Sequence, residues 1–242
     1  MMNMKEADQL GKHISFFFNS TPHNEIYTLL SPVLAERTPF RYLERIGETF
    51  GSGQIEPVRE FLDLIAAEGT EGGWVVIGGA LRTQLDRDLS GTFDYAHKYI
   101  IAADIWYGAD ILGERVPGPG LVHYFDDVLP LLGLWKEDPN RWVRRALGVA
   151  IHFWGKRSNG NSNLTNKVKL LLDFVEPLFT EWDLAAAKGI GWGLKTLGKY
   201  YPDQITEWLP KQVNRRHRSI MLKKALTYLP VEQREQIRNQ SE

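Results

Sequence analysis

Residues 183–200 have the sequence DLAAAKGIGWGLKTLGKY, and this stretch decides the fold class of the chain. At about 100° per residue, one side of it is apolar or small, which is typical of a buried helix face. The residues on that side are Leu184, Ala187, Ile190, Gly191, Leu194 and Leu197. The opposite side places Trp192 in a row of cations that contains Lys188, Lys195 and Lys199. We expect an amphipathic helix that presents an indole among ammonium groups to an anionic partner.

The same helical period continues through nearly the whole chain, and Pro or Gly interrupts it every ~15–20 residues. No segment alternates with period two over the length of a strand, so the sequence predicts an all-α protein. The strongest break is expected at Pro117-Gly-Pro-Gly120. The predicted helices span about 5–19, 25–36, 41–50, 56–68, 73–88, 92–113, 121–136, 140–155, 165–180, 183–200, 203–213, 216–228 and 231–239.

Two of these segments resemble each other weakly. Each has an Asp, then small apolar residues, then a late Gly-Lys pair, at Gly155-Lys156 and at Gly198-Lys199. The pairs are 43 residues apart, which is in the range of HEAT-type helical repeats. We therefore predict one domain over 1–242, an α-solenoid of HEAT-like repeats that is curved and has a basic concave face.

Composition narrows the function classes. The chain has 242 residues, of which 43% are apolar and 24% charged, as in ordinary globular proteins. No apolar run approaches the ~20 residues of a membrane span, and the N-terminus shows no signal peptide. The absence of Cys excludes disulfides, thiol catalysis and Cys-ligated zinc. We expect a cytoplasmic monomer that has no contact with a membrane.

The net charge of −1 conceals an asymmetry between the halves. Residues 1–121 carry 10 Lys and Arg against 17 Asp and Glu, whereas residues 122–242 carry 19 against 13. An anion-binding surface requires an excess of positive charge such as the second half has. An imbalance of several charges also arises by chance on solvated faces.

A second basic stripe is predicted on the helix at 140–155. Arg141, Arg145, Gly148, His152 and Lys156 fall on one side of it. Alone, this pattern is typical of a solvated face; beside the stripe at 183–200 it favours a phosphate-binding ridge. Further cations near the C-terminus either extend that ridge or act as capping charges: Arg215, Arg216, Arg218, Lys223 and Lys224.

The segment Trp106-Tyr-Gly-Ala-Asp110 places an indole and a carboxylate one turn apart on one helix face. The alternative is a core Trp beside an exposed Asp. The six His residues show no metal-ligand spacing, so neither a metal nor a cofactor is predicted. Five Gly residues on the two basic helices indicate close approach, either of backbones or of a ligand: Gly148, Gly189, Gly191, Gly193 and Gly198.

Three motifs together resemble the AlkD-like DNA alkylation repair glycosylases, a family built of HEAT-like repeats. Trp106-x-x-x-Asp110 looks like the family's Trp and Asp pair. Arg141-Trp-Val-Arg-Arg145-Ala looks like its Trp-x-x-Arg-Ala segment, and Ile190-Gly-Trp192-Gly-Leu-Lys195 looks like its Ile-Gly-Trp-x-Leu-Arg segment. The likeness covers about 90–240, and residues 1–89 fit only as additional N-terminal repeats.

The resemblance implies base excision repair: hydrolysis of the N-glycosidic bond of N3- or N7-alkylated purines in double-stranded DNA, without base flipping. It implies catalytic roles for Asp110, Trp106 and Trp192. The cations expected to bind DNA are Arg141, Arg145, Lys156, Lys188, Lys195, Lys199 and Arg218. Two alternatives remain, a catalytically silent DNA-binding protein of the same fold and a protein-interaction scaffold.

Overall fold

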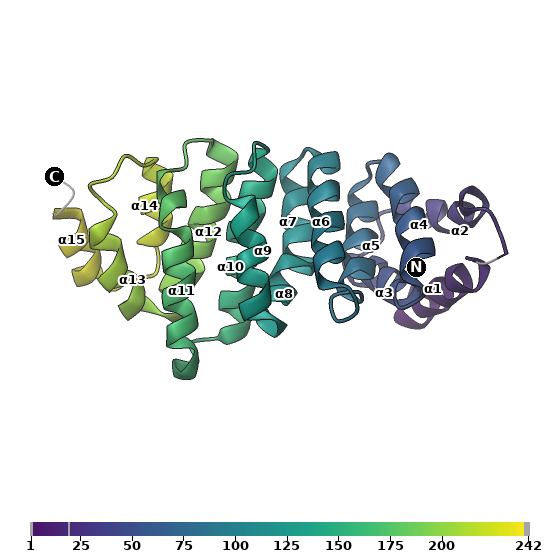
Figure 1. Ribbon diagram of the computed structural model, residues 1–242, viewed down its shortest axis with the longest axis horizontal. Coiled ribbons are helices and arrows are strands. Elements are labelled where there is room, and N and C mark those ends of the chain that lie inside the picture. The colour runs from purple at the N-terminus through teal and green to yellow at the C-terminus, as the bar shows by residue number, and fades with distance from the viewer. Residues whose placement is uncertain (1, 19, 240–242) are drawn as a thin grey trace. The chain divides into compact units, whose positions relative to one another are not determined.

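The computed structural model describes residues 2–18 and 20–239, and every regular element within these ranges is a helix (Figure 1). The prediction of an all-α protein is confirmed. The chain divides after Val116 into two compact units. Because each unit is compact in itself, the single domain over 1–242 stays a prediction.

The first unit alternates helices between two rows. Helices α1, α3, α5 and α7 pack in succession, and α2, α4 and α6 pack in succession beside them. This arrangement of helical pairs is the one expected of repeats. The bounds are α1 Met4–Phe17, α2 His23–Ala35, α3 Phe40–Gly51, α4 Ile55–Ala67, α5 Glu71–Arg82, α6 Leu89–Ala103 and α7 Trp106–Arg115.

The second unit repeats the scheme. Helices α8, α10, α12 and α14 pack in succession, while α11 packs against α13. The bounds are α8 Pro117–His123, α9 Phe125–Trp135, α10 Arg141–Ser158, α11 Thr165–Val175, α12 Leu184–Tyr200, α13 Pro202–Trp208, α14 Ser219–Ala225 and α15 Val231–Asn239. Short 3₁₀ turns occur at Ser162–Leu164 (η1), Pro177–Thr180 (η2) and Leu209–Lys211 (η3).

Glycines set the closest helix contacts in both units. A Cβ on Gly47 would lie 2.1 Å from the carbonyl oxygen of Val76, so α3 touches the backbone of α5. A Cβ on Gly148 would lie 2.0 Å from the carbonyl oxygen of Gly189, so α10 touches α12 in the same way. Helix backbones this close exclude any larger side chain at the crossing.

Several predictions about helix ends are wrong. The helices predicted over 73–88 and 203–213 end earlier, at Arg82 and at Trp208. Residues 92–113 do not form one helix, because Asp104 adopts a left-handed conformation with φ 42° and ends α6. Gly108 then permits the tight corner into α7, where a Cβ would lie 2.4 Å from that of Ala103. The expected break at 117–120 is instead the first turn of α8. Prolines are tolerated there because the first N–H groups of a helix have no intrahelical partner.

The apolar face predicted on α12 is buried, with one exception. Leu184, the first residue of the helix, is 43% exposed. Its period was right, but a helix terminus projects beyond the neighbour that covers the later turns. Among the described residues, no helix is both long and apolar enough to cross a membrane.

Candidate nucleic-acid interface

Helix α12 carries the central part of the candidate interface. Asp183 starts it by accepting hydrogen bonds from the backbone N–H groups of Ala185 and Ala186 at 2.8 and 3.1 Å. The glycines of the next turns serve packing against α10. A Cβ on Gly189 would lie 2.5 Å from the carbonyl oxygen of Arg145, and one on Gly193 would lie 2.8 Å from that of Gly148. Of the two reasons considered for these glycines, close packing of backbones is therefore the one that the structure supports.

Trp192 is partly exposed, and one face of its indole is covered by a histidine. The rings of His152 and Trp192 stack with centroids 3.9 Å apart and an angle of 26° between their planes. His152 Nδ1 lies 2.6 Å from Thr196 Oγ1. Because Thr196 donates its own proton to the carbonyl oxygen of Trp192, Nδ1 of His152 must be the donor to Thr196. This chain of bonds fixes the orientation of the His152 imidazole, against which the indole stacks.

The stacked histidine is uncharged at neutral pH. Burial is the main cause that lowers the pKa of His152, and the positive charges of Lys156, Lys195 and Lys224 lower it further, to about 4. The sequence placed His152 on an exposed basic stripe, either a solvated face or a phosphate-binding ridge, but only 8% of it is exposed. The stripe is therefore split, with Arg141 and Lys156 exposed and the residues between them packed against α12.

The lysines of α12 lie on the solvent side, as predicted. Lys188 and Lys199 are exposed, and Lys195 is partly exposed. Nζ of Lys195 and Nζ of Lys199 lie 5.2 and 5.8 Å from the ring centroid of Tyr228. Tyr228, which the sequence did not single out, is 49% exposed and thus adds an aromatic ring to this cationic row.

Two of the three arginines of the α10 motif, Arg145 and Arg141, have different environments. Arg145 is 9% exposed, and its Nη1 donates to the carbonyl oxygen of Ala185 at 3.1 Å. Arg141 is exposed, and its guanidinium carbon lies 4.8 Å from the ring centroid of Trp142. Arg145 thus ties α10 to the first turn of α12, whereas Arg141 offers its donors to solvent.

In the first unit, Trp106 and Asp110 lie one turn apart at the start of α7. Trp106 is 56% exposed and meets Tyr107 edge to face, with centroids 5.8 Å apart. This excludes the alternative of a core tryptophan. Asp110 is partly exposed. The Trp106 indole is therefore accessible to a partner.

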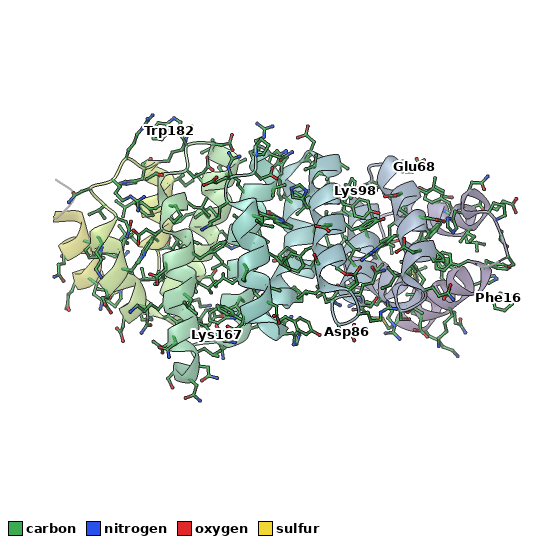
Figure 2. All side chains as sticks on the ribbon, viewed as in Figure 1. Phe16, Glu68, Asp86, Lys98, Lys167 and Trp182 are labelled. Atoms are coloured by element: carbon green, nitrogen blue, oxygen red, sulfur yellow. The ribbon has the colours of Figure 1, made fainter. Side chains whose placement is uncertain are left out.

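A second exposed indole was missed from the sequence. Trp182, which Figure 2 shows projecting outward, is 48% exposed in the loop between η2 and α12. The guanidinium carbons of Arg216 and Arg218 lie 4.1 and 5.1 Å from its ring centroid. Local sequence could have flagged only the run Arg215-Arg-His-Arg218, since its partner lies more than 30 positions away.

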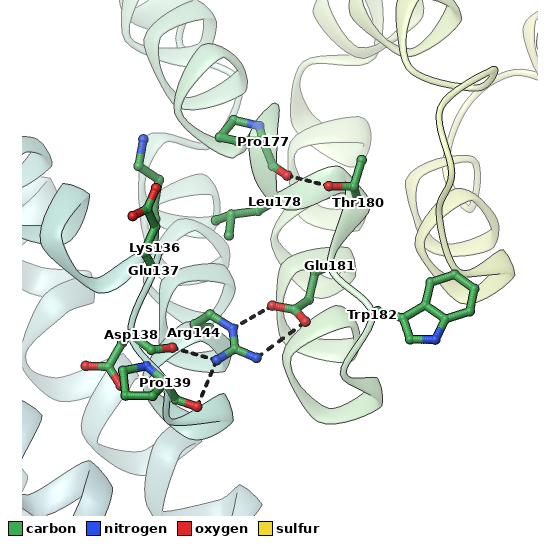
Figure 3. A pocket seen from close by; sticks show the side chains of 10 residues that line it. All are labelled: Lys136, Glu137, Asp138, Pro139, Arg144, Pro177, Leu178, Thr180, Glu181 and Trp182. Carbon is green, nitrogen blue, oxygen red and sulfur yellow. Dashed lines mark hydrogen bonds and ion pairs between the residues drawn. The ribbon is translucent and has the colours of Figure 1, made fainter.

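A cavity of about 500 Å³ lies beside the Trp182 loop. Arg144 spans it: Nε is 2.6 Å from the Glu181 carboxylate, and Nη1 donates to the carbonyl oxygens of Asp138 and Pro139 at 2.6 and 3.1 Å (Figure 3). No residue predicted as catalytic or DNA-binding lines this cavity. Among the described residues, no group of three His, Asp or Glu side chains could hold a metal ion.

A model of the family described as DNA alkylation repair enzyme matches residues 59–229. The chain belongs to this family. The match begins before residue 90, where the likeness of the motifs starts, and it includes Trp106 and Asp110 as well as Arg145 and Trp192. Comparisons with curated proteins and with solved structures give no match.

Proposed function

We propose that the protein is a DNA glycosylase of base excision repair that hydrolyses the N-glycosidic bond of N3- or N7-alkylated purines in duplex DNA. The observation that carries the proposal is the stacked pair of Trp192 and His152, within the segment matched by the DNA alkylation repair family. An imidazolium would occupy the electron-rich face of an indole. Because His152 is neutral, the indole keeps its attraction for a cation on its other face.

The substrate supplies the cation. An alkylated purine is already positively charged, so it leaves without a general acid, and charge develops on the deoxyribose as the bond lengthens. Water attacks C1′, the C1′–N bond breaks, and its electron pair neutralises the purine. The water gives up a proton to the solvent and leaves a hydroxyl on the sugar. The products are a neutral alkylated base and an abasic site.

Each residue in the proposal interacts with a charge of the substrate, either the cation that develops on the sugar or the phosphate backbone. The Asp110 carboxylate stabilises the oxocarbenium-like sugar and orients the water. The indoles of Trp106 and Trp192 add cation–π attraction of roughly 0.5–2 kcal/mol each. Arg141, Lys188 and Lys199, which are exposed, contact the phosphate backbone. Lys156 and Lys195 extend these contacts, while Arg145 reaches a phosphate only by the exposed edge of its guanidinium.

The test is release of 7-methylguanine and 3-methyladenine from methylated duplex DNA. The wild-type protein should release them, and Asp110→Asn should slow release by about 100-fold or more, because the neutral amide cannot stabilise the sugar cation. Asp126→Asn is the control, since Asp126 is exposed on α9 and has no part in the proposal. Release by Asp110→Asn at the wild-type rate would overturn the mechanism. Salt-dependent duplex binding without release would leave the catalytically silent alternative, and the absence of both would leave the scaffold.

A further inference from the structure

The loop between η3 and α14 alternates the direction of its basic side chains. Arg215 points inward: its Nη1 donates to the Glu176 carbonyl oxygen at 3.1 Å and to Gln212 Oε1 at 2.7 Å. His217 also points inward, where its ring lies 5.1 Å from that of Phe179. Arg216 and Arg218 take the opposite direction and stack on Trp182. Two cations are thus placed on one exposed indole by a loop that their neighbours anchor.

The loop that carries Trp182 is also held in place by hydrogen bonds. The Glu181 carboxylate accepts from Arg144 Nε at 2.6 Å and from the Asp183 backbone N–H at 2.7 Å. Arg218 Nε donates to the carbonyl oxygen of Trp182, which joins the two loops. The indole and its cations are therefore held in place before any partner arrives, which lowers the entropy cost of binding.

The donors that face solvent define the ligand. Within residues 2–18 and 20–239, Arg216 makes no hydrogen bond or ion pair, so its five N–H donors stay unused while the Trp182 ring supports its plane. In the part of the chain that the structure describes, Arg218 donates a hydrogen bond through Nε alone. Planar guanidinium edges match the oxygens of a phosphodiester in a bidentate manner.

We propose that Trp182, Arg216 and Arg218 form a clamp for the phosphate backbone of duplex DNA, away from the lesion. This rests on the proposed function, which makes DNA the substrate. Trp182 lies in the loop before α12, and with a rise of 1.5 Å per residue Trp192 lies about 12 Å along that helix from its first residue, Leu184. That length corresponds to roughly three to four steps of 3.4 Å along a duplex strand. The clamp therefore holds flanking phosphates and sets affinity, whereas Trp192 meets the damaged nucleotide.

The experiment measures binding of undamaged duplex DNA by fluorescence anisotropy over a series of salt concentrations. The double variant Arg216→Gln/Arg218→Gln should bind at least about tenfold more weakly at low salt. The slope of log K against log salt should shrink by about 1–2, because each lost phosphate contact removes about 0.9. Arg216→Lys should keep the slope but weaken binding, since a lysine keeps the charge and loses the planar contact with the indole.

The matched control is Lys169→Gln/Lys211→Gln. It removes the same two charges from the second unit, at exposed positions beside another cavity on α11 and α13. Equal losses in the control and the clamp variant would show that net charge alone matters, and wild-type binding by the clamp variant would show that the clamp is idle. Either result overturns the clamp and leaves the glycosylase intact. If the wild-type protein neither binds duplex DNA nor releases alkylated bases, the proposed function fails, and the clamp fails with it.

Discussion

Helices α3, α5 and α7 of the first unit and helices α10, α12 and α14 of the second share one packing scheme and carry different charges on it. Gly47 meets the backbone of Val76 as Gly148 meets that of Gly189. Next along each triplet, a Cβ on Gly78 would meet the Arg115 side chain, as one on Gly191 would meet that of Lys224. The sequences agree with this register, since IGGALRT at 77–83 aligns with IGWGLKT at 190–196.

The difference lies in what stands on the shared positions. In the first unit, Glu44 pairs with Arg82 at 2.6 Å and with Arg115 at 3.5 Å, and Glu48 also pairs with Arg82. The register places Arg145 at the position of Glu44 and Val149 at that of Glu48. It places His152 where the first unit has Gly51, and Trp192 where it has Gly79.

The comparison shows that one packing scheme can carry two different sets of charges. In the first unit, Arg82 and Arg115 form ion pairs with Glu44 and Glu48, and this ladder of ion pairs stabilises the fold. The second unit has Arg145 and Val149 in place of the two carboxylates and carries two rings where the first unit has glycines. Within the described part of the chain, Lys195 forms no ion pair, so its charge remains available to an anion. Substitutions can therefore separate the shared packing from the charges placed on it.

The largest expected effect tests the packing. Gly148→Ala and Gly47→Ala should each lower the free energy of unfolding by about 3 kcal/mol or more, because the new methyl would overlap a helix backbone that cannot move away. Gly133→Ala is the control: it lies inside α9, and among the described residues no atom beyond its chain neighbours and the nearby backbone of its own helix lies within 4 Å of its Cβ position. It should stabilise by up to about 1 kcal/mol. Thermal or urea unfolding measures the stability of all three variants. If Gly148→Ala were tolerated while Gly47→Ala was not, the two helix crossings would not be equivalent.

The next effect tests the histidine that only the second triplet has. The pKa of His152 is lowered from 6.5 to about 4, so the unfolded state binds its proton first as the pH falls. Its contribution to stability is present above pH 6.5 and should decline by on the order of 2 kcal/mol toward pH 4. His152→Gln cannot titrate and should flatten this part of the pH profile. Parallel profiles for both proteins would contradict the assignment.

A smaller effect tests the ion pairs that Arg82 forms with Glu44 and Glu48 in the first unit. Arg82→Gln leaves Glu44 and Glu48 side by side without their shared cation, and we expect a loss of about 1–2 kcal/mol in unfolding free energy. Urea unfolding at neutral pH measures it. At a pH low enough to protonate both carboxylates, the loss should shrink, which distinguishes repulsion between them from a packing defect.

The smallest effect is at the equivalent position of the second unit. Lys195→Gln should change the free energy of unfolding by less than about 0.5 kcal/mol, because its contact with Tyr228 is partly solvated. Its effect should instead appear as weaker duplex binding with a salt slope smaller by about 1. If Lys195→Gln were strongly destabilised and bound duplex DNA as well as the wild type, Lys195 would serve stability, as Arg82 does in the first unit.

Sequence periodicity was sufficient to predict the all-α class and the position of most helices. The reason is that apolar residues recurring about every 3.6 positions form a single buried face in few structures other than a helix. It failed at 104–105 and at 117–120, where local rules allow two outcomes. A left-handed Asp104 ended a helix that the period would continue. Prolines that usually break a helix stood in its first turn, where they cost little.

The candidate site, too, could be predicted only in part from the sequence. By itself, the sequence determined which residue types share a face: Trp192 with its lysines, Trp106 with Asp110, and arginines on α10. Only the tertiary structure decided that His152 is buried against Trp192 and uncharged, that Arg145 ties two helices together, and that Trp182 carries two arginines from a loop more than 30 residues away. The physical reason is that periodicity fixes direction on one helix, whereas burial and charge depend on the helix packed against it.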